Sequence, residues 1–227
     1  MTADAPDITV IVSAYREAER LPATLGAVRE AFPGARVLVA DDGSPDATPD
    51  AALAEGAELV RCGRTIGKGG AMTLAAQRVL ADTTAGVVVL CDGDLAQSAG
   101  DLGGLVEAVR EGSCDLAIAR FARKVGGGFG LAVGFSRWAT RSLSGLELEA
   151  PISGQRAMRL EVLAAVVPFA PRFGMETGMN VDAVRAGFRV CEVELPLSHR
   201  ATGKTLKGFL HRGRQLKDFA LVYRHRR

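Results

Sequence analysis

The chain has 227 residues, of which 48% are hydrophobic and 24% are charged, a composition typical of a folded globular protein. No apolar run approaches the roughly 20 residues that cross a bilayer, and the polar, acidic start over residues 1–7 is unlike a secretory signal. The net charge of +2 is divided unevenly, −9 over residues 1–118 and +11 over residues 119–227. The basic second half would suit an anionic partner such as a phosphate group, a membrane surface or a nucleic acid.

The four cysteines are scattered and form no Cys-x-x-Cys pair. This spacing favours reduced, mostly buried thiols and indicates neither a zinc site nor a disulfide framework. We therefore expect a cytoplasmic protein. The cysteines are Cys62, Cys91, Cys114 and Cys191.

The first 120 residues alternate between short β-branched runs and helical patterns. Strands are predicted at 8–14, 35–40, 59–62, 86–91 and 114–119, and helices at 20–32, 46–55, 67–80 and 102–110. This alternation predicts an α/β protein with a Rossmann-like, mostly parallel sheet and helices on both faces.

After residue 120 the pattern loosens, and a glycine-rich loop is predicted at 124–130. Helices are predicted at 131–143, 160–167, 175–186 and 204–227, and strands at 154–159 and 188–195. The helix at 204–227 is basic and amphipathic, with Asp218 as its single acid. It would lie either on an anionic bilayer or against the rest of the protein with a solvated basic face. Without a linker, the chain is expected to form one domain of residues 1–227.

Polar side chains follow four of the predicted strands, and in a parallel sheet these strand ends meet at one edge. The Asp92-Gly93-Asp94 run offers two carboxylates at a spacing that suits Mg²⁺ or Mn²⁺, although an Asp-Gly turn alone would also end a strand. Convergence of four clusters favours one shared site. The clusters are Tyr15 and Glu17, then Asp41, Asp42 and Ser44, then Asp92 and Asp94, and finally Arg120.

The Gly67-Lys68-Gly69-Gly70 run precedes a predicted helix, where free N–H groups attract phosphate. The run lacks the spacing of a Walker A loop, and no dinucleotide fingerprint follows the first strand. By itself it is equally compatible with a flexible loop.

Taken together, the motifs resemble the family 2 glycosyltransferases of the GT-A fold. The resemblance covers residues 8–120 and rests on Ser13-Ala14-Tyr15-x-Glu17, Asp41-Asp42-Gly43-Ser44, Gly67-Lys68-Gly69-Gly70-Ala71 and Asp92-Gly93-Asp94, in that order. The second half is similar to the polyprenyl-phosphate (dolichyl-phosphate type) mannosyl- and glucosyltransferases of the family, through Arg120-Phe121, Ser153-Gly154-Gln155-Arg156-Ala157, Glu176 and His199-Arg200-x-x-Gly203-Lys204. Glu176 and His199 also resemble the soluble glucosyl-phosphoglycerate synthases.

The resemblance implies roles for individual residues. Residues 8–120 would bind the nucleotide sugar and residues 121–227 the acceptor. The donor-binding residues would be Ala14, Tyr15, Glu17, Asp42, Lys68, Asp92, Arg120 and Lys204; the metal ligands for Mg²⁺ or Mn²⁺ would be Asp92, Asp94 and His199; and the catalytic residues would be Asp94, Glu176 and Arg200. Gln97 stands one place later than the glutamine that often follows the aspartates in the lipid-linked enzymes.

The implied reaction is inverting transfer of a hexose from a donor such as UDP-glucose or GDP-mannose. A hydroxyl acceptor would need a general base, for which Glu176 is the best candidate; the alternative for Glu176 is a helix-terminal acid stabilised by the dipole. A phosphate acceptor is already ionised and would need cations, which favours a phosphorylated acceptor such as polyprenyl phosphate at the inner face of the plasma membrane. The cations on offer are Arg120, Arg123, Lys124, Arg137, Arg141, Arg156 and Arg200.

Other classes of protein remain as alternatives. A soluble enzyme acting on a small hydroxyl acceptor, a nucleotidyltransferase and an inactive sugar-nucleotide sensor would share the paired carboxylates. Nucleic-acid binding is disfavoured, because there is no recognised motif and aromatic residues make up only 5% of the chain. Self-association is left open.

Overall fold

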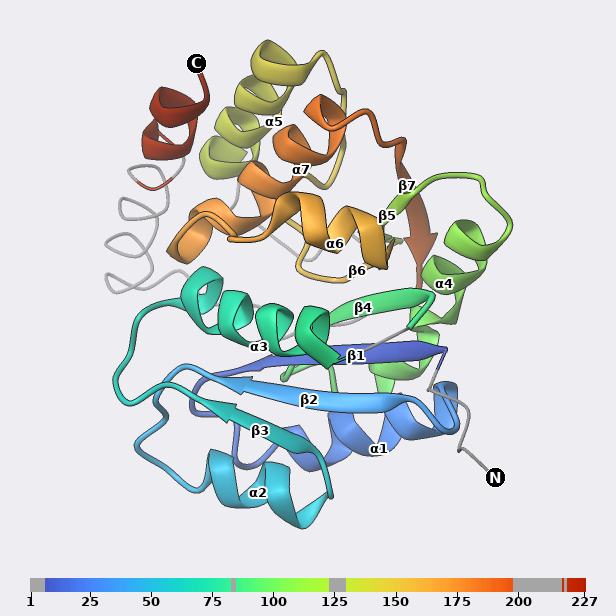
Figure 1. Cartoon of the computed structure of the whole chain (residues 1–227), viewed down its shortest axis with the longest axis vertical. Coiled ribbons are helices and arrows are strands. Elements are labelled where there is room, and N and C mark those ends of the chain that lie inside the picture. Colours follow the sequence, from blue (N-terminus) through green and yellow to red (C-terminus); the bar gives the residue numbers. More distant parts are fainter. Residues whose placement is uncertain (1–6, 83–84, 123–129, 198–217, 219) are drawn as a thin grey trace.

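The computed structural model describes residues 7–82, 85–122, 130–197, 218 and 220–227. A seven-stranded sheet runs through the molecule in the order β3-β2-β1-β4-β6-β5-β7 (Figure 1). Its neighbouring strands are parallel, except that β6 is antiparallel to both β4 and β5. The strands are β1 (Ile8–Ala14), β2 (Arg36–Asp41), β3 (Glu58–Arg61), β4 (Val87–Asp92), β5 (Leu116–Phe121), β6 (Arg156–Arg159) and β7 (Val190–Leu195).

Helices cover both faces of the sheet, as the alternating sequence pattern predicts (Figure 1). The α-helices are α1 (Leu21–Ala31), α2 (Thr48–Ala54), α3 (Lys68–Asp82), α4 (Gly103–Arg110), α5 (Gly130–Ser144), α6 (Leu160–Val166) and α7 (Met175–Arg185). Two short 3₁₀ helices, η1 (Ala96–Leu102) and η2 (Arg172–Gly174), were not predicted.

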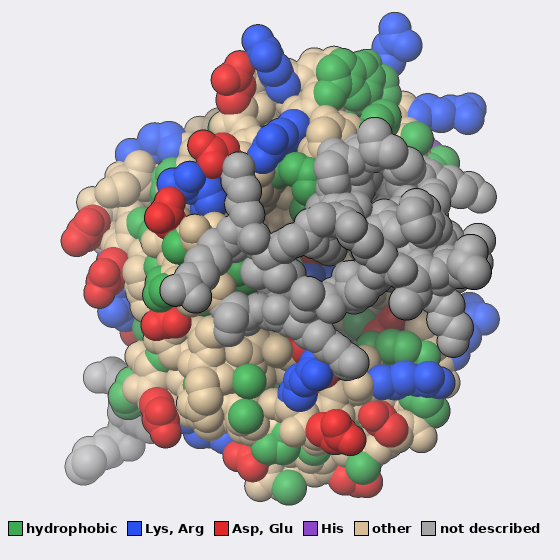
Figure 2. Space-filling model, turned by 180° about the vertical axis from the view of Figure 1, so that it is seen from behind, with side chains coloured by type: hydrophobic (Ala, Val, Ile, Leu, Met, Phe, Trp, Pro, Cys, Tyr) green, Lys and Arg blue, Asp and Glu red, His purple; other side chains and the backbone are tan. Residues whose placement is uncertain are grey.

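The core consists of two layers separated by the sheet. Val10 and Val12 of β1 pack with α1, η1 and α4, whereas Ile11 points to the other face and packs with α3, α6 and α7. The central strands are buried on both faces, which is why their sequences are continuous β-branched runs. Burial of each such side chain contributes about 1.5–3 kcal/mol. Charged side chains of both signs are scattered over the face shown in Figure 2.

The predicted strands and helices of the described segments are confirmed, with ends that shift by at most two residues. The helix predicted at 204–227 lies mostly outside the described residues. In the part that is described, residues 220–226 are helical. Within the described chain, no helix has both the length and the apolar character needed to span a membrane.

The position of β6 was not apparent from the sequence. This strand comes from the second half of the chain but inserts between β4 and β5, pairing Ala157 with Val89 on one side and with Ala117 on the other. The insertion separates two strands that are consecutive in the chain. It also carries the loop before β6 to the carboxyl end of β4.

The prediction of four reduced thiols is wrong for one pair, because Cys114 and Cys191 form a disulfide. Cys114 lies just before β5 and Cys191 lies in β7, and the parallel pairing of these strands brings the two Cα atoms to 5.8 Å. Their separation of 77 residues hides this proximity from the sequence. Cys62 and Cys91 are buried and free, as predicted.

Candidate active site

The loops that follow β1, β2 and β4 are joined by hydrogen bonds at the carboxyl edge of the sheet. The backbone N–H of Arg16 donates to Ser44 Oγ at 3.0 Å, and the N–H of Asp42 donates to the Ala14 carbonyl at 3.0 Å. Ser13 Oγ donates to Asp92 Oδ1 at 2.9 Å. Three of the four predicted strand-end clusters therefore do meet in one place.

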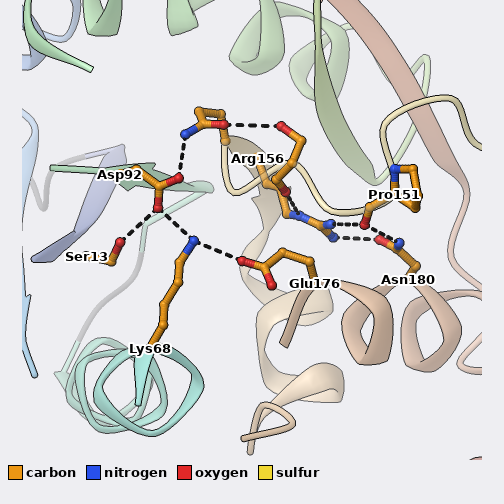
Figure 3. Close-up of polar contacts among 9 residues, drawn as sticks. Ser13, Lys68, Asp92, Pro151, Arg156, Glu176 and Asn180 are labelled. Carbon is orange, nitrogen blue, oxygen red and sulfur yellow. Dashed lines mark hydrogen bonds and ion pairs between the residues drawn. The ribbon is translucent and has the colours of Figure 1, made fainter. Parts of the chain in front are cut away.

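Asp92 lies at the centre of this edge, at the end of β4 (Figure 3). Its Oδ1 accepts from Ser13 and forms an ion pair with Lys68 Nζ at 2.7 Å, while its Oδ2 accepts from Gln155 Nε2 at 2.8 Å. Burial alone would raise the pKa of Asp92, but Lys68 and the hydrogen bonds outweigh it and hold the pKa below its ordinary value. The carboxylate is therefore ionised and held from three sides.

Lys68 connects the two halves of the chain, because its Nζ also lies 2.9 Å from Glu176 Oε1. Burial alone would lower the pKa of Lys68, but the charges of Asp92 and Glu176 outweigh it and raise the pKa. Glu176 is buried in the first turn of α7. Glu176 is thus a helix-terminal acid whose carboxylate contacts Lys68 (Figure 3), and its role as a general base stays a prediction.

A buried arginine supports the loop that carries Gln155. Arg156 donates to the Ser153 carbonyl at 2.9 Å, to Asn180 Oδ1 at 2.7 Å and to the Pro151 carbonyl at 3.1 Å. Its side chain is fully buried, and this burial lowers its pKa. The expectation that Arg156 offers its charge to a phosphate is wrong, because its guanidinium is used to fix the loop between α5 and β6 (Figure 3).

Asp42 organises the loop that leads into α3. Its Oδ1 accepts from the N–H of Ile66 at 2.7 Å, and both of its oxygens accept from the N–H of Gly67 at 2.9 Å. Nearby, a recess of about 350 Å³ is lined by Gly43, Arg61, Cys62 and Gly63. Asp42 therefore positions the loop beside this recess, and a role in contacting the donor's base or ribose stays a prediction.

Two glycines of the Gly67-Lys68-Gly69-Gly70 run are explained by close packing. Gly67 has a φ of +93°, and a Cβ there would lie 2.7 Å from the Arg172 side chain. A Cβ on Gly69 would lie 2.1 Å from the Ala170 carbonyl oxygen. The run lets the start of α3 approach residues 170–172, which brings Lys68 between Asp92 and Glu176.

Gly154 has an equally specific reason to be glycine. A Cβ at this position would lie 2.5 Å from Asp92 Oδ2 and 2.6 Å from Lys68 Nζ. The loop backbone thus covers the Lys68–Asp92 ion pair directly, leaving no space for a side chain.

The predicted metal site fits a divalent cation only in part. Hard carboxylate oxygens are suitable donors, but both oxygens of Asp92 already accept from protein groups. Within the described ranges no group of three or more His, Cys, Asp or Glu side chains gathers to hold a metal ion. Binding of Mg²⁺ or Mn²⁺ by Asp92 and Asp94 therefore stays a prediction. Gln97 is exposed in η1.

The expected phosphate-binding role of Arg120 stays a prediction, because in the structure this side chain is paired with acids. Arg120 lies within β5, and its two Nη atoms form ion pairs with Glu149 at 2.9 Å and with Glu194 at 2.6 Å. Arg141 is likewise paired with Glu147 at 3.2 Å. The positive charge of the second half is therefore partly neutralised by neighbouring acids.

The remaining predicted residues fall into two groups. Tyr15 is 42% exposed, with Arg16 stacked over its ring, and Glu17 donates its N–H to Thr48 Oγ1. Five others lie outside the described residues: Arg123, Lys124, His199, Arg200 and Lys204.

Sequence reasoning did not assign roles to Ser13 and Gln155, although both bind Asp92. Both belong to stretches quoted for the family resemblance, and that was the only signal. Their approach to Asp92 spans 79 and 63 residues, respectively, so no local pattern could reveal it.

Comparison with known proteins agrees with this geometry. The family model for glycosyl transferase family 2 matches residues 9–149, and the chain belongs to this family. It is 34% identical to an undecaprenyl-phosphate mannosyltransferase of Micrococcus luteus over 87% of the chain and 86% of that protein. It is 32% identical to a polyprenol monophosphomannose synthase of Mycolicibacterium smegmatis over 86% of the chain and 78% of that protein.

Solved structures confirm the GT-A fold. Glucosyl-3-phosphoglycerate synthase of Mycobacterium tuberculosis in complex with Mg²⁺ and uridine diphosphate superposes with a TM-score of 0.76 at 26% identity, covering 96% of this chain and 79% of that one. The same enzyme with Mn²⁺, uridine diphosphate and glucosyl-3-phosphoglycerate gives 0.75 at 25% identity, covering 96% and 80%. Structural neighbours of this chain thus bind a divalent cation and a nucleotide.

Proposed function

We propose that this protein transfers a hexose, with inversion at the anomeric carbon, from a nucleotide diphosphate sugar to polyprenyl phosphate. Residues 8–120 bind the donor and residues 121–227 the acceptor. Two relatives at 34% and 32% identity are named as enzymes that mannosylate a polyprenyl phosphate, which favours mannose and a GDP-sugar donor over UDP-glucose.

The observation that carries the choice of acceptor is the position of Glu176. Its carboxylate is buried and ion-paired to Lys68, which is itself paired to Asp92. A general base must direct a carboxylate oxygen at the acceptor hydroxyl, whereas Glu176 Oε1 already lies 2.9 Å from Lys68 Nζ. A phosphate acceptor arrives already ionised and needs no base, so this arrangement suits a phosphate better than a hydroxyl group.

The proposed chemistry uses the carboxyl edge of the sheet. Asp92 is ionised and immobilised, so it can accept hydrogen bonds from hydroxyl groups of the donor. Asp94 would hold Mg²⁺ or Mn²⁺, and the bound cation would neutralise the charge that develops on the departing nucleoside diphosphate. The Ile66–Gly67 loop, fixed by Asp42, borders the recess near Arg61 where the nucleoside would lie.

A second candidate is transfer to a small phosphorylated hydroxyl acceptor. It is favoured by the structural match over 96% of the chain to an enzyme named glucosyl-3-phosphoglycerate synthase. In that case Glu176 would have to leave Lys68 to act as a base.

We propose a cytoplasmic location for the enzyme, at the inner face of the plasma membrane where a lipid acceptor would be reached.

The test is a panel assay with purified protein. It combines Mg²⁺ or Mn²⁺ with UDP- and GDP-sugars and one of three additions: polyprenyl phosphate, 3-phosphoglycerate or no acceptor. We expect release of nucleoside diphosphate that depends on the metal and on polyprenyl phosphate. Release that depends on 3-phosphoglycerate instead would select the second candidate, and release of pyrophosphate would indicate a nucleotidyltransferase.

A further inference from the structure

One end of the molecule carries an exposed surface that the proposed catalytic site does not use. It is formed by the outward faces of α5 and of the C-terminal helical segment 220–226, which lie at the upper end of the molecule in Figure 1. Figure 2 shows hydrophobic side chains at this end with Lys or Arg side chains beside them. We call it the Trp138 surface, defined by Arg137, Trp138, Arg141, Leu221, Tyr223 and Arg224.

We propose that the Trp138 surface docks on an anionic lipid bilayer. This inference rests on the proposed function, since it names the surface that would bring the site to a lipid acceptor. In Figure 1 the carboxyl end of β2 points toward the side of the molecule on which the C-terminal segment lies. The loop that follows β2 is on this side too. A protein docked through this surface would hold the mouth of the site near the membrane.

Two large apolar side chains of this surface, one of them aromatic, are exposed. Trp138 is 51% exposed and Leu221 is 40% exposed, although both are large apolar side chains. The Trp138 ring lies 4.7 Å from the ring of Tyr223 and 5.4 Å from that of Phe135, measured between centroids. Clustered Trp and Tyr rings with one wet side are suited to the headgroup region of a bilayer, where an apolar body and a polar tip are both satisfied.

The C-terminal helical segment is fixed in the orientation that this surface requires. Arg226 donates to Asp182 of α7 at 2.7 Å through Nε and at 2.5 Å through Nη2. Val222 is 3% exposed and packs against Gly174, where a Cβ would lie 2.5 Å from Val222 Cγ2. With Val222 and Arg226 facing inward, Leu221 and Arg224 share the outward face at a spacing of three residues.

The charges of the surface select an anionic partner. Arg224 is exposed and forms no ion pair with the described part of the chain, and the Arg137 guanidinium donates to the uncharged carbonyl of Glu149. Arg141 is paired with Glu147, but both side chains are largely exposed, so the pair adds little. Anionic headgroups attract such a cluster. Symmetric pairing of this surface with itself in a second copy would instead bring like charges together.

The chain offers its own probe, because Trp138 is its single tryptophan. Wild-type protein is titrated, without donor or acceptor, with vesicles of phosphatidylcholine alone or with phosphatidylglycerol added. We expect a blue shift of the Trp138 emission with the anionic vesicles, together with quenching by brominated lipid. No shift, an equal shift with neutral vesicles, or a shift that follows protein concentration without vesicles would overturn the proposal.

Two variants, both of which retain Trp138, distinguish docking through this surface from a general effect of net charge. Arg224→Glu should weaken vesicle binding roughly fivefold or more. Arg78→Glu, which makes the same charge change on the exposed face of α3, should bind within twofold of wild type. Equal weakening by both variants would contradict docking through the Trp138 surface. Transfer to a short-chain acceptor in detergent should be unchanged in Arg224→Glu, so failure of docking and failure of the proposed reaction are distinguishable.

Discussion

The ammonium group of Lys68 lies within 3 Å of two carboxylates, 2.7 Å from Asp92 and 2.9 Å from Glu176. This bridge joins residues 8–120 to residues 121–227, and we propose that Glu176 has a positioning role in place of the base that a hydroxyl acceptor would need. Glu176 holds Lys68, and Lys68 in turn keeps Asp92 ionised.

Replacing Glu176 with glutamine tests this assignment, because the amide oxygen can still accept from Lys68 but cannot act as a base. We expect Glu176→Gln to retain kcat within about tenfold of wild type, with an unchanged pH–rate profile. Steady-state kinetics with polyprenyl phosphate provide the measurement. A loss of about 10³-fold or more in kcat, with disappearance of an acidic limb, would show that Glu176 is a base.

Removing the cation should affect stability in a pH-dependent way. Lys68→Met leaves the buried carboxylate of Glu176 and the partly buried carboxylate of Asp92 without their partner, so we expect a loss of about 2–4 kcal/mol in the free energy of unfolding at pH 7. The pKa of Asp92 is lower in the folded state than its ordinary value near 3.9. Asp92 therefore stabilises the fold fully above that ordinary pKa, and this stabilisation is lost as the pH falls through the lower pKa of the folded state.

The difference in the free energy of unfolding between wild type and Lys68→Met should therefore become smaller below about pH 4. It should stay constant between about pH 5 and 9. At alkaline pH, the raised pKa of Lys68 means that its contribution to stability is lost only above the ordinary lysine pKa of about 10.4. Urea titrations across this range test the statement. A gap that widens toward acid pH would contradict the ion-pair account.

Among the elements, α3 is placed by its glycines. Gly67 and Gly69 let the start of the helix pack against the backbone of residues 170–172, and Lys68 between them then points into the site. The glycine-rich run was interpreted from its sequence as a phosphate-binding loop or a flexible loop. In the structure its glycines serve helix packing.

Gly69→Ala should accordingly cost about 1–3 kcal/mol, because its Cβ would overlap the Ala170 carbonyl oxygen. Gly26→Ala in α1 is the matched control, since a Cβ there has no neighbour within 4 Å. The control should be neutral or stabilising by up to about 1 kcal/mol. Thermal or chemical unfolding of the two variants provides the measurement, and equal stabilities would refute the packing explanation.

At the scale of the whole molecule, the sequence predicted the elements and their common edge but not the contacts between distant segments. The β-branched runs made the strands recognisable, and three of the polar clusters after them meet at one edge, as predicted. The pairing of Lys68 with Glu176 spans 108 residues and that of Gln155 with Asp92 spans 63. Such pairs depend on the antiparallel insertion of β6 and on the packing of α7, which no local pattern specifies.

The disulfide is a further case of this kind and makes a direct prediction. Native protein unfolded in guanidinium without reductant should show two reactive thiols, from Cys62 and Cys91, because Cys114 and Cys191 are bonded to each other. Thiol titration, repeated after reduction, should then give four. Four thiols before reduction would contradict the disulfide.

We propose that a hexose moves from a nucleotide diphosphate sugar to polyprenyl phosphate at the edge formed by Asp92 and Asp94. The most direct measurement follows radiolabelled sugar from GDP-mannose into an organic-phase product, with wild type and Asp94→Ala compared at equal folded concentration. We predict a labelled, mild-acid-labile lipid product with wild type and a loss of at least about 10²-fold with the variant. Label that stays in the aqueous phase with wild type, or equal labelling by Asp94→Ala, would contradict the account.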